Sequence, residues 1–250
     1  MNAVEQALEL FSSLTLEEME SHSLQDRIDT KFIFPLSLLP SLLNTLHPSY
    51  AVLRIHASAL HPYETVYFDT PSLELYAAHH NDKGSRLKVR YRSYPATGLC
   101  FFEIKNKSNK DRTTKYRIAQ GEVKKEIAGE AEVLLKTYSS FSGADLIPQL
   151  GVNYTRITLV SLQTAERLTF DLQLQAQRGE HRHTFGDIVV GELKQAHKME
   201  SPFLQAMKKA GVREASLSKY CQGLSMTYPG IKSNKFKQTR LLIQKFTHAR

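Results

Sequence analysis

The chain has 250 residues, of which 41% are hydrophobic, and this is enough for one large domain with a buried core. Its formal net charge of +8 indicates an anionic partner, which can be a nucleic acid, a membrane surface or a phosphorylated small molecule. The two cysteines form no metal or redox motif, and the acidic start lacks the pattern of a signal peptide, so we expect a soluble cytoplasmic protein rather than a secreted disulfide scaffold.

The predicted elements begin with one helix over residues 2–20, which is amphipathic with Val4, Leu8, Phe11 and Leu14 on one face. Alternating or β-branched segments bounded by turn residues then predict a series of strands. These strands cover residues 26–34, 61–70, 84–94, 98–107, 113–121, 148–162, 166–177 and 185–195. Further helices are predicted over residues 36–46, 72–81, 122–140 and 201–212.

Three parts of the chain follow from this pattern. We expect an N-terminal helix within residues 1–24, one domain over residues 25–227 and a solvated basic tail over residues 228–250. The most apolar segment, residues 32–46, contains two prolines and is too short to span a bilayer, so we expect no transmembrane segment. The buried stripe of the helix over 122–140 is predicted to consist of Val123, Ile127, Val133 and Leu134.

Charged residues occupy every second position in most of the predicted strands. Because successive strand side chains point to opposite faces, each such set lies on one surface, and the residues between them are mostly apolar. The sets are Arg27, Asp29 and Lys31; Lys88, Arg90 and Arg92; Glu103 and Lys105; Lys115 and Arg117; Arg167 and Asp171; and Glu192 and Lys194. A solvated outer face explains any single strand, but Arg and Lys dominate across the six sets taken together, with a carboxylate in four of them, which favours a shared interior.

The pattern therefore predicts an α+β protein: an antiparallel β-barrel tunnel of about eight strands, with a polar cationic interior and helices packed outside. A bound polyanion such as a triphosphate would compensate the buried cations, which are otherwise costly. Interior carboxylates would repel the phosphates unless Mg²⁺ or Mn²⁺ lay between them.

The order of the strand motifs resembles that of a known family. The motifs are "DRIDTKF", "YFDT", "RLKVRYR", "FEIKNK", "RTTKYR", "NYTRITL", "ERLTFD", "GELK" and "LSKYC". Together they are similar to the VTC (vacuolar transporter chaperone) domain, the polyphosphate polymerase branch of the triphosphate tunnel metalloenzymes, a superfamily with a CYTH-like fold. The resemblance covers residues 25–223.

This resemblance implies a tunnel that binds ATP and polyphosphate with a divalent metal, preferably Mn²⁺, and transfers the γ-phosphoryl group of ATP to a growing chain. The implied catalytic phosphate contacts are Lys31, Arg90, Arg92, Lys105, Arg156, Arg167 and Lys219. Additional phosphate contacts are Arg27, Lys88, Lys115, Arg117 and Lys194. Glu192 would hold the metal, and Glu103 and Asp171 would assist it or orient the basic residues.

Two alternatives share this site. One is a metal-dependent triphosphatase, although the first strand carries Arg27, Asp29 and Lys31 instead of the Glu-x-Glu-x-Lys pattern of the wider superfamily. The other is a polyphosphate or nucleic-acid binding module without turnover. The strand aromatics alternate away from the cations, which disfavours base stacking, so we expect no specific nucleic acid partner. The pairs His79–His80 and His181–His183 are expected to be surface or loop residues and not metal ligands.

Overall fold

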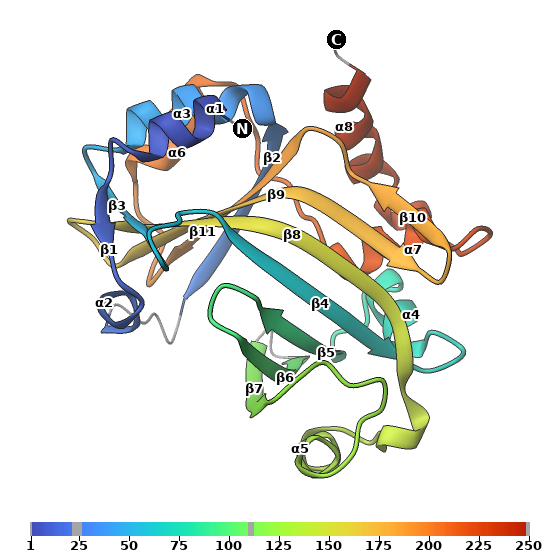
Figure 1. Cartoon of the computed structure of the whole chain (residues 1–250). Helices are drawn as coiled ribbons and strands as arrows, with labels where there is room; N and C mark the ends of the chain where they lie inside the picture. Colours follow the sequence, from blue (N-terminus) through green and yellow to red (C-terminus); the bar gives the residue numbers. More distant parts are fainter. Residues whose placement is uncertain (1, 22–26, 110–112, 249–250) are drawn as a thin grey trace.

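The structure, a computed structural model, describes residues 2–21, 27–109 and 113–248 (Figure 1). The strands are β1 Ser12–Leu14, β2 Ile28–Pro35, β3 Tyr50–Leu53, β4 His61–Asp69, β5 Arg86–Tyr94, β6 Leu99–Lys107, β7 Thr113–Gln120, β8 Ile147–Ser161, β9 Glu166–Arg178, β10 His181–Thr184 and β11 Ile188–Gln195. The helices are α1 Asn2–Leu8, α2 Leu16–Ser21, α3 Leu39–Leu46, α4 Glu74–His80, α5 Glu130–Tyr138, α6 Pro202–Lys209, α7 Lys219–Thr227 and α8 Lys237–His248. Short 3₁₀ turns are η1 Leu36–Leu38, η2 Gly143–Asp145 and η3 Asn234–Phe236.

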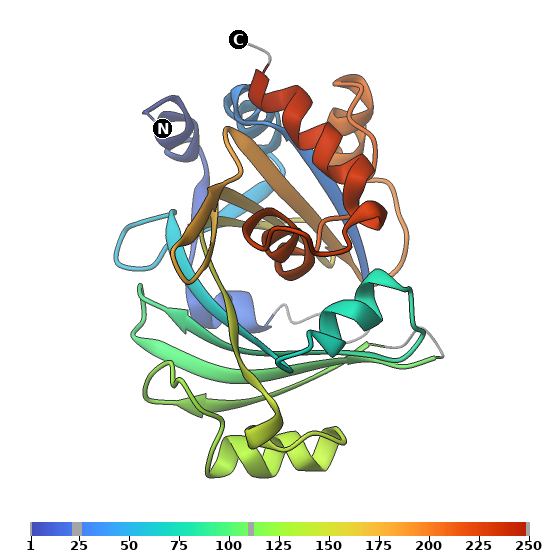
Figure 2. The ribbon, with the colours of Figure 1, turned by 90° about the vertical axis from the view of Figure 1, so that its right-hand side faces the viewer.

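One large sheet contains all of these strands. Its main path runs β2-β11-β9-β8-β4-β5-β6-β7, and every neighbouring pair along this path is antiparallel. The expected α+β architecture is therefore confirmed. The expected closure of the barrel is not observed, because within the described residues the end strands β2 and β7 are not hydrogen-bonded to each other. The sheet curls around a central space without closing (Figure 2).

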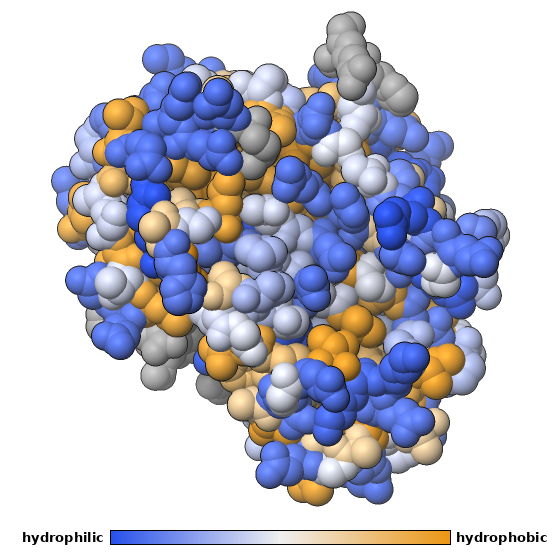
Figure 3. Space-filling view, viewed as in Figure 1, coloured by the Kyte–Doolittle hydropathy of each residue, from blue (hydrophilic) through white to orange (hydrophobic). Residues whose placement is uncertain are grey.

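The outer face of the sheet carries most of the hydrophobic core. Helices α1, α3 and α6 cover the β2-β11-β9-β8 half, where Phe32, Phe34 and Phe170 are at most 3% exposed. The outer surface of these helices is mainly hydrophilic (Figure 3). Helix α5 covers the outer face of β5 and β6, where Val89 and Phe102 are fully buried. Strand alternation thus directs the intervening charged residues to the inner face.

Helices α4, α7 and α8 form a second layer on the inner side of the curl. Helix α7 lies between the two halves of the sheet in Figure 2, and its Leu224 packs in one cluster with Leu150 of β8 and Ile243 of α8. Gly223 permits this close approach, because a Cβ at this position would lie 2.6 Å from Cδ2 of Leu150 and 3.1 Å from Cβ of Ala176. One end of the central space is therefore filled by helices.

Two predictions for the chain ends are wrong. Residues 2–20 do not form one helix: α1 and α2 are separated by β1, which pairs with β3 in a parallel register that joins Ser12 to Ala51. The basic tail is not merely solvated, because it forms η3 and α8, with Ile243 only 7% exposed. Hydrophobic contacts with the sheet and its helices outweigh the charge of these segments. The predicted domain boundary at residue 24 lies outside the described residues.

Two further differences concern the middle of the chain. Helix α5 starts only at Glu130, and Val133 is 66% exposed, whereas the helix buries Ala131 and Leu135. Residues 181–184, for which the sequence predicted no strand, form β10 on the edge of β9. No helix in the described part of the chain has the length and apolarity needed to cross a bilayer, as expected.

Candidate functional site

The alternating charged residues of neighbouring strands lie opposite one another on the inner face. In β5, β6 and β7, Arg90 is paired with Glu103, which is paired in turn with Arg117. On the other half of the sheet, Glu192 of β11 is paired with Lys31 of β2. In β5, β6 and β7 the register also pairs Lys88 with Lys105, and Lys105 with Lys115. On the other half it pairs Lys194 of β11 with Asp29 and Arg167, and Arg156 of β8 with Asp171 of β9. Sheet register thus gathers residues that are far apart in sequence.

The first ion-pair group surrounds Glu103. Its carboxylate lies 2.6 Å from a guanidinium nitrogen of Arg90 and contacts Nζ of Lys115, and the side chain is only 1% exposed. Burial alone would raise the pKa of Glu103, but Arg90, Arg92 and Lys115 lower it to about 2. Burial lowers the pKa of Lys115 to about 8 although Glu103 opposes this change. Glu103 is therefore ionised at neutral pH and holds two cations.

The second group surrounds Asp171 and includes helix α7. Arg156 donates two hydrogen bonds of 2.6 and 2.8 Å to the carboxylate, and Nζ of Lys219 lies 2.5 Å from it. Burial raises the pKa of Asp171, whereas Arg156 and Lys219 lower it to about 2. Ser218 caps α7 by accepting a hydrogen bond from the Cys221 amide, and it also accepts one of 3.1 Å from Nζ of Lys88. The start of α7 thus lies among the charged strands.

The third group surrounds Glu192. Its carboxylate lies 2.8 Å from Nζ of Lys31 and 2.5 Å from Nζ of Lys194. Burial raises the pKa of Glu192, but both lysines hold it well below its usual value. Burial lowers the pKa of Lys194 to about 8 against the opposing charge of Glu192. Next to this group, Arg27 and Asp29 form an ion pair of 3.1 Å.

The two halves of the sheet are close enough to interact across the central space. Burial lowers the pKa of Lys105 on β6, and the charges of Lys88, Asp29, Lys31 and Glu192 also act on it. Lys88 is the strand neighbour of Lys105, but β6 is not a neighbour of β2 or β11 in the sheet, so Asp29, Lys31 and Glu192 interact with Lys105 through the space. We call this space, with the charged side chains around it, the lumen.

Solvent reaches the lumen. The side chains of Lys31, Arg90, Arg156 and Lys219 point inward, yet they are 31%, 17%, 15% and 15% exposed. A cavity of about 370 Å³ lies between α4 and the residues after α7, and one of about 400 Å³ lies at β4, β8 and β9, where Tyr63 and Tyr154 are among its lining residues. Neither is lined by the predicted charged residues. The lumen is the place where the cations converge.

All of the predicted site residues belong to the inner face. The structure brings together Arg27, Lys31, Lys88, Arg90, Arg92, Lys105, Lys115, Arg117, Arg156, Arg167, Lys194 and Lys219, with the carboxylates Glu103, Asp171 and Glu192 among them. Arg117 lies near the edge of the lumen, with its guanidinium 4.7 Å from the centre of the Phe101 ring. Their roles in binding and catalysis stay predictions.

Two polar residues of the lumen received no role from the sequence. The Tyr154 hydroxyl and Oγ1 of Thr169 are buried without a hydrogen-bond partner among the described residues. Tyr154 precedes Arg156 by two positions, and Thr169 stands between Arg167 and Asp171, so strand alternation places both on the charged face. Buried polar groups usually have partners, so these two groups are suited to bind a ligand.

The aromatic residues do not all point away from the cations, as the sequence had suggested. The guanidinium of Arg92 lies 5.7 Å from the ring centre of Tyr63 and 6.0 Å from that of Tyr154. Arg156 lies 4.8 Å from the Tyr63 ring. The period-two pattern already placed Tyr94 and Phe101 on the same faces as Arg92 and Glu103, and this signal was overlooked.

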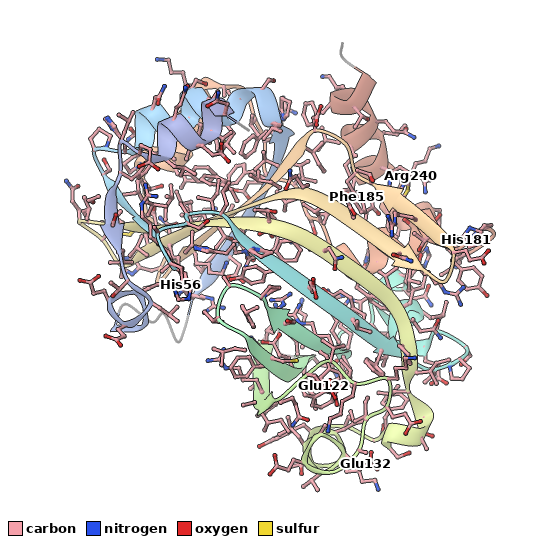
Figure 4. All side chains as sticks on the ribbon, viewed as in Figure 1. His56, Glu122, Glu132, His181, Phe185 and Arg240 are labelled. Carbon is pink, nitrogen blue, oxygen red and sulfur yellow. The ribbon has the colours of Figure 1, made fainter. Side chains whose placement is uncertain are left out.

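The histidine pairs are only partly at the surface. His181 is exposed on β10, at the edge of the molecule in Figure 4. His80, expected at the surface or in a loop, is instead 7% exposed on α4, where its ring nitrogens lie 3.0 and 2.7 Å from the side-chain oxygens of Asn81 and Asn234. Packing of α4 against η3 buries it, and it lies outside the lumen.

A metal ion held in the lumen would need oxygens from a ligand besides those of the protein. Among residues 2–21, 27–109 and 113–248, no three His, Cys, Asp or Glu side chains are grouped to hold a metal ion. The side chains of Glu103 and Asp171 are 1% and 3% exposed, and each is held by two cations. The Glu192 side chain is 18% exposed between two lysines. It therefore fits a Mg²⁺ or Mn²⁺ site with one carboxylate, phosphate oxygens and water.

Solved structures with a similar fold share little sequence with this chain. A putative adenylate cyclase from Bacillus halodurans has a TM-score of 0.50 and 14% identity, covering 79% of this chain and 96% of that one. One from Vibrio parahaemolyticus has a TM-score of 0.48 and 14% identity, with 81% and 99% covered. A putative adenylyl cyclase from Hippeastrum, described as having a dominant triphosphatase activity, has a TM-score of 0.46 and 16% identity, with 80% and 95% covered. Similarity at this level concerns the fold alone.

A comparison with families gives a more specific result. No curated protein matches the chain. The model of the VTC domain matches residues 26–228, a range that contains the whole main path of the sheet and helix α7. The sequence motifs had indicated the same family over nearly the same range. The chain belongs to the VTC domain family.

Proposed function

We propose that this protein is a polyphosphate polymerase that transfers the γ-phosphoryl group of ATP to the end of a polyphosphate chain. The observation that carries the proposal is the solvent-accessible lumen, in which Arg and Lys side chains from seven strands and α7 converge and outnumber the carboxylates. Such an excess of partly buried cations favours a polyanion. Membership of the VTC domain family supports this choice of substrate.

The arrangement suits phosphoryl transfer because this reaction depends on positioning and charge stabilisation. A terminal oxygen of the acceptor chain attacks the γ-phosphorus in line. The bond between this phosphorus and the β,γ-bridging oxygen breaks, and ADP leaves with the electron pair. The attacking oxygen is already ionised, so the step requires no general base. Arg156 and Arg90, fixed by Asp171 and Glu103, would stabilise the charge that develops on the transferred group.

Glu192 is the residue that we propose to hold the divalent cation. Bound there together with phosphate oxygens, Mn²⁺ or Mg²⁺ would reduce repulsion between the phosphates and the carboxylate. Lys31 and Lys194 flank Glu192 and would contact the same phosphates from either side. Tyr154 and Thr169 would donate their unpartnered hydroxyls to phosphate oxygens.

Product analysis tests the proposal. The purified protein is incubated with ATP and Mn²⁺, and the products are resolved on phosphate-stained gels and by ³¹P NMR. Chains longer than three phosphates together with ADP are expected. Free phosphate without chains would mean that water is the acceptor, and the protein would then be a triphosphatase. If ATP binds but stays intact, the lumen is a binding site without turnover.

A further inference from the structure

Three aromatic side chains lie on the charged face at one end of the lumen. Tyr63 is near the start of β4, Tyr94 ends β5 and Phe101 is near the start of β6. These positions are adjacent, because the register pairs Glu64 with Ser93, Arg92 with Phe101 and Tyr94 with Leu99. We call Tyr63, Tyr94 and Phe101 the aromatic rim.

The rings of the rim are in contact with one another. The ring centres of Tyr63 and Tyr94 are 4.9 Å apart, and those of Tyr94 and Phe101 are 5.9 Å apart, both in edge-to-face arrangements. Tyr63 also stacks on Tyr154 at 5.2 Å with an angle of 21°. A continuous aromatic surface therefore leads from the edge of the lumen to its wall.

The rim remains accessible, unlike the aromatic residues of the outer face. Tyr63, Tyr94 and Phe101 are partly exposed, whereas Tyr91 and Phe102 on the same strands are fully buried beneath α5. Packing onto α5 accounts for the burial of Tyr91 and Phe102. Tyr63 also packs against the inner hydrophobic cluster that includes Tyr154, whereas Tyr94 and Phe101 remain partly exposed on the charged face of the solvent-accessible lumen.

Arginines connect the rim to the proposed phosphate site. Arg92 and Arg156 lie 5.7 and 4.8 Å from the centre of the Tyr63 ring, and Arg117 lies 4.7 Å from that of Phe101. A triphosphate held by Arg92 and Arg156 would carry its attached nucleoside to within reach of the rim. Aromatic rings and guanidinium groups are the side chains on which bases stack.

The opposite end of the lumen has a different character. There the inner positions of β5, β6 and β7 carry Arg86, Lys88, Lys105, Lys107 and Lys115, and no aromatic residue is interleaved with them. The start of α7 faces Lys88 at this end. This end suits phosphate groups alone, so the two ends of the lumen differ: one offers aromatic rings with arginines, and the other offers only cations.

We propose that the aromatic rim stacks on the base of the nucleoside triphosphate, which places the nucleoside at the rim and the γ-phosphate towards Lys88 and α7. The proposal rests on the proposed function. Stacking uses the faces of a base and not its edges, so ATP and GTP are expected to bind alike. The acceptor chain would then approach the γ-phosphate from the α7 end.

A single tryptophan can report on the rim, because the chain contains none. In Phe101→Trp, ATP is expected to quench the tryptophan fluorescence strongly, whereas inorganic tripolyphosphate at a saturating concentration changes it little. The matched reporter Tyr116→Trp, on the outer face of β7, should respond to neither ligand. Equal responses of Phe101→Trp to ATP and tripolyphosphate would overturn the assignment of the rim.

Affinities separate this proposal from the function on which it rests. Calorimetry with Tyr94→Leu, Phe101→Leu and the control Tyr116→Leu is expected to show ATP affinity reduced about 5- to 100-fold in the first two only. Tripolyphosphate affinity should change by less than about twofold in all three. If Tyr94→Leu and Phe101→Leu lose equal affinity for both ligands, or lose none for ATP, the assignment of the rim is wrong and the proposed function is unaffected. A wild-type protein that binds neither ligand contradicts the proposed function as well.

Discussion

At the scale of single residues, the carboxylates of the lumen are the least intuitive feature of a site meant for phosphates. Glu103 and Asp171 are almost fully buried, and each is in contact with two cations. Without them, the basic side chains would repel one another in a medium that screens charge poorly. We interpret both as residues that hold basic neighbours in position, and Glu192 as the one with room for a metal.

The first prediction concerns the pair Arg90 and Glu103. Arg90→Ala leaves a buried carboxylate with one cation fewer, so we expect the free energy of unfolding to fall by about 3 kcal/mol. Adding Glu103→Gln should recover part of this loss. Urea denaturation of the two single variants and the double variant measures the coupling. Additive effects would show that the two side chains do not depend on each other.

The second prediction concerns Lys194, whose pKa is lowered to about 8 mainly by burial. Between pH 8 and about 10.4, the unfolded chain binds more protons at this lysine than the folded protein does. The contribution of Lys194 to stability therefore rises with pH in this window. Tripolyphosphate prefers the protonated amine, so its metal-free affinity should fall over the same range. Calorimetry from pH 7 to 10 checks this, and Lys194→Gln should weaken both dependences, of which a part remains because the pKa of Lys115 is also lowered to about 8.

At the scale of elements, α7 connects the hydrophobic core to the lumen. Its buried side packs against β8 and β9, and its first residues, with the Ser218 cap, contact Lys88 and Asp171. The motif "LSKYC" alone predicts an ordinary helix start. Only the position of the helix inside the curled sheet brings Lys219 to the carboxylate.

The third prediction tests this connection with Gly223→Ala. The added Cβ would contact Leu150 and Ala176, which pushes α7 away from the sheet. We expect a loss of about 1–3 kcal/mol in stability and weaker tripolyphosphate binding, because Lys219 moves with the helix. Ser225→Ala, in the same helix, serves as the control. Unchanged tripolyphosphate affinity in a folded Gly223→Ala protein would show that binding does not depend on how closely α7 packs against the sheet.

The fourth prediction concerns α8, which the sequence had suggested to be a solvated tail. Ile243 is 7% exposed, and Leu241 in the same helix is 53% exposed. Ile243→Ala should therefore lower the free energy of unfolding by about 2–4 kcal/mol, and Leu241→Ala by less than about 0.5 kcal/mol. Equal small effects in denaturation experiments would mean that α8 does not pack on the domain in solution.

At the scale of the whole molecule, the curled sheet brings like charges together from strands that are not paired. Lys105 and Lys88 on one half lie near Lys31 on the other. Their mutual repulsion opposes the curl, and the hydrophobic layers outside, together with the ion pairs inside, hold the sheet in place. A bound polyanion would relieve this repulsion.

The fifth prediction follows from this balance. Tripolyphosphate at a hundredfold excess over its dissociation constant should stabilise the protein by about 2.7 kcal/mol, seen as a rise in melting temperature. Two charge-matched double variants distinguish binding in the lumen from binding at the surface of α6: Lys88→Gln with Lys105→Gln, and Lys208→Gln with Lys209→Gln. Only the double variant in the lumen should reduce the rise in melting temperature caused by tripolyphosphate. Equal reductions would indicate unspecific binding to a basic protein.

Much of this description was present in the sequence because strand alternation is a local property. The period of two assigned the charged residues to one face, and the order of the motifs indicated the VTC domain family. Local patterns could not decide how the sheet ends meet or which cation faces which carboxylate, because these depend on register and curvature. The same holds for β1, α8 and the aromatic rim, whose surroundings come from distant segments. The sequence by itself determined the eight strands of the main path, their charged faces and the family. The tertiary structure decided the short strands β1, β3 and β10, the open curl, the ion-pair partners and the direction of the lumen, because these arise from contacts between residues that are remote along the chain.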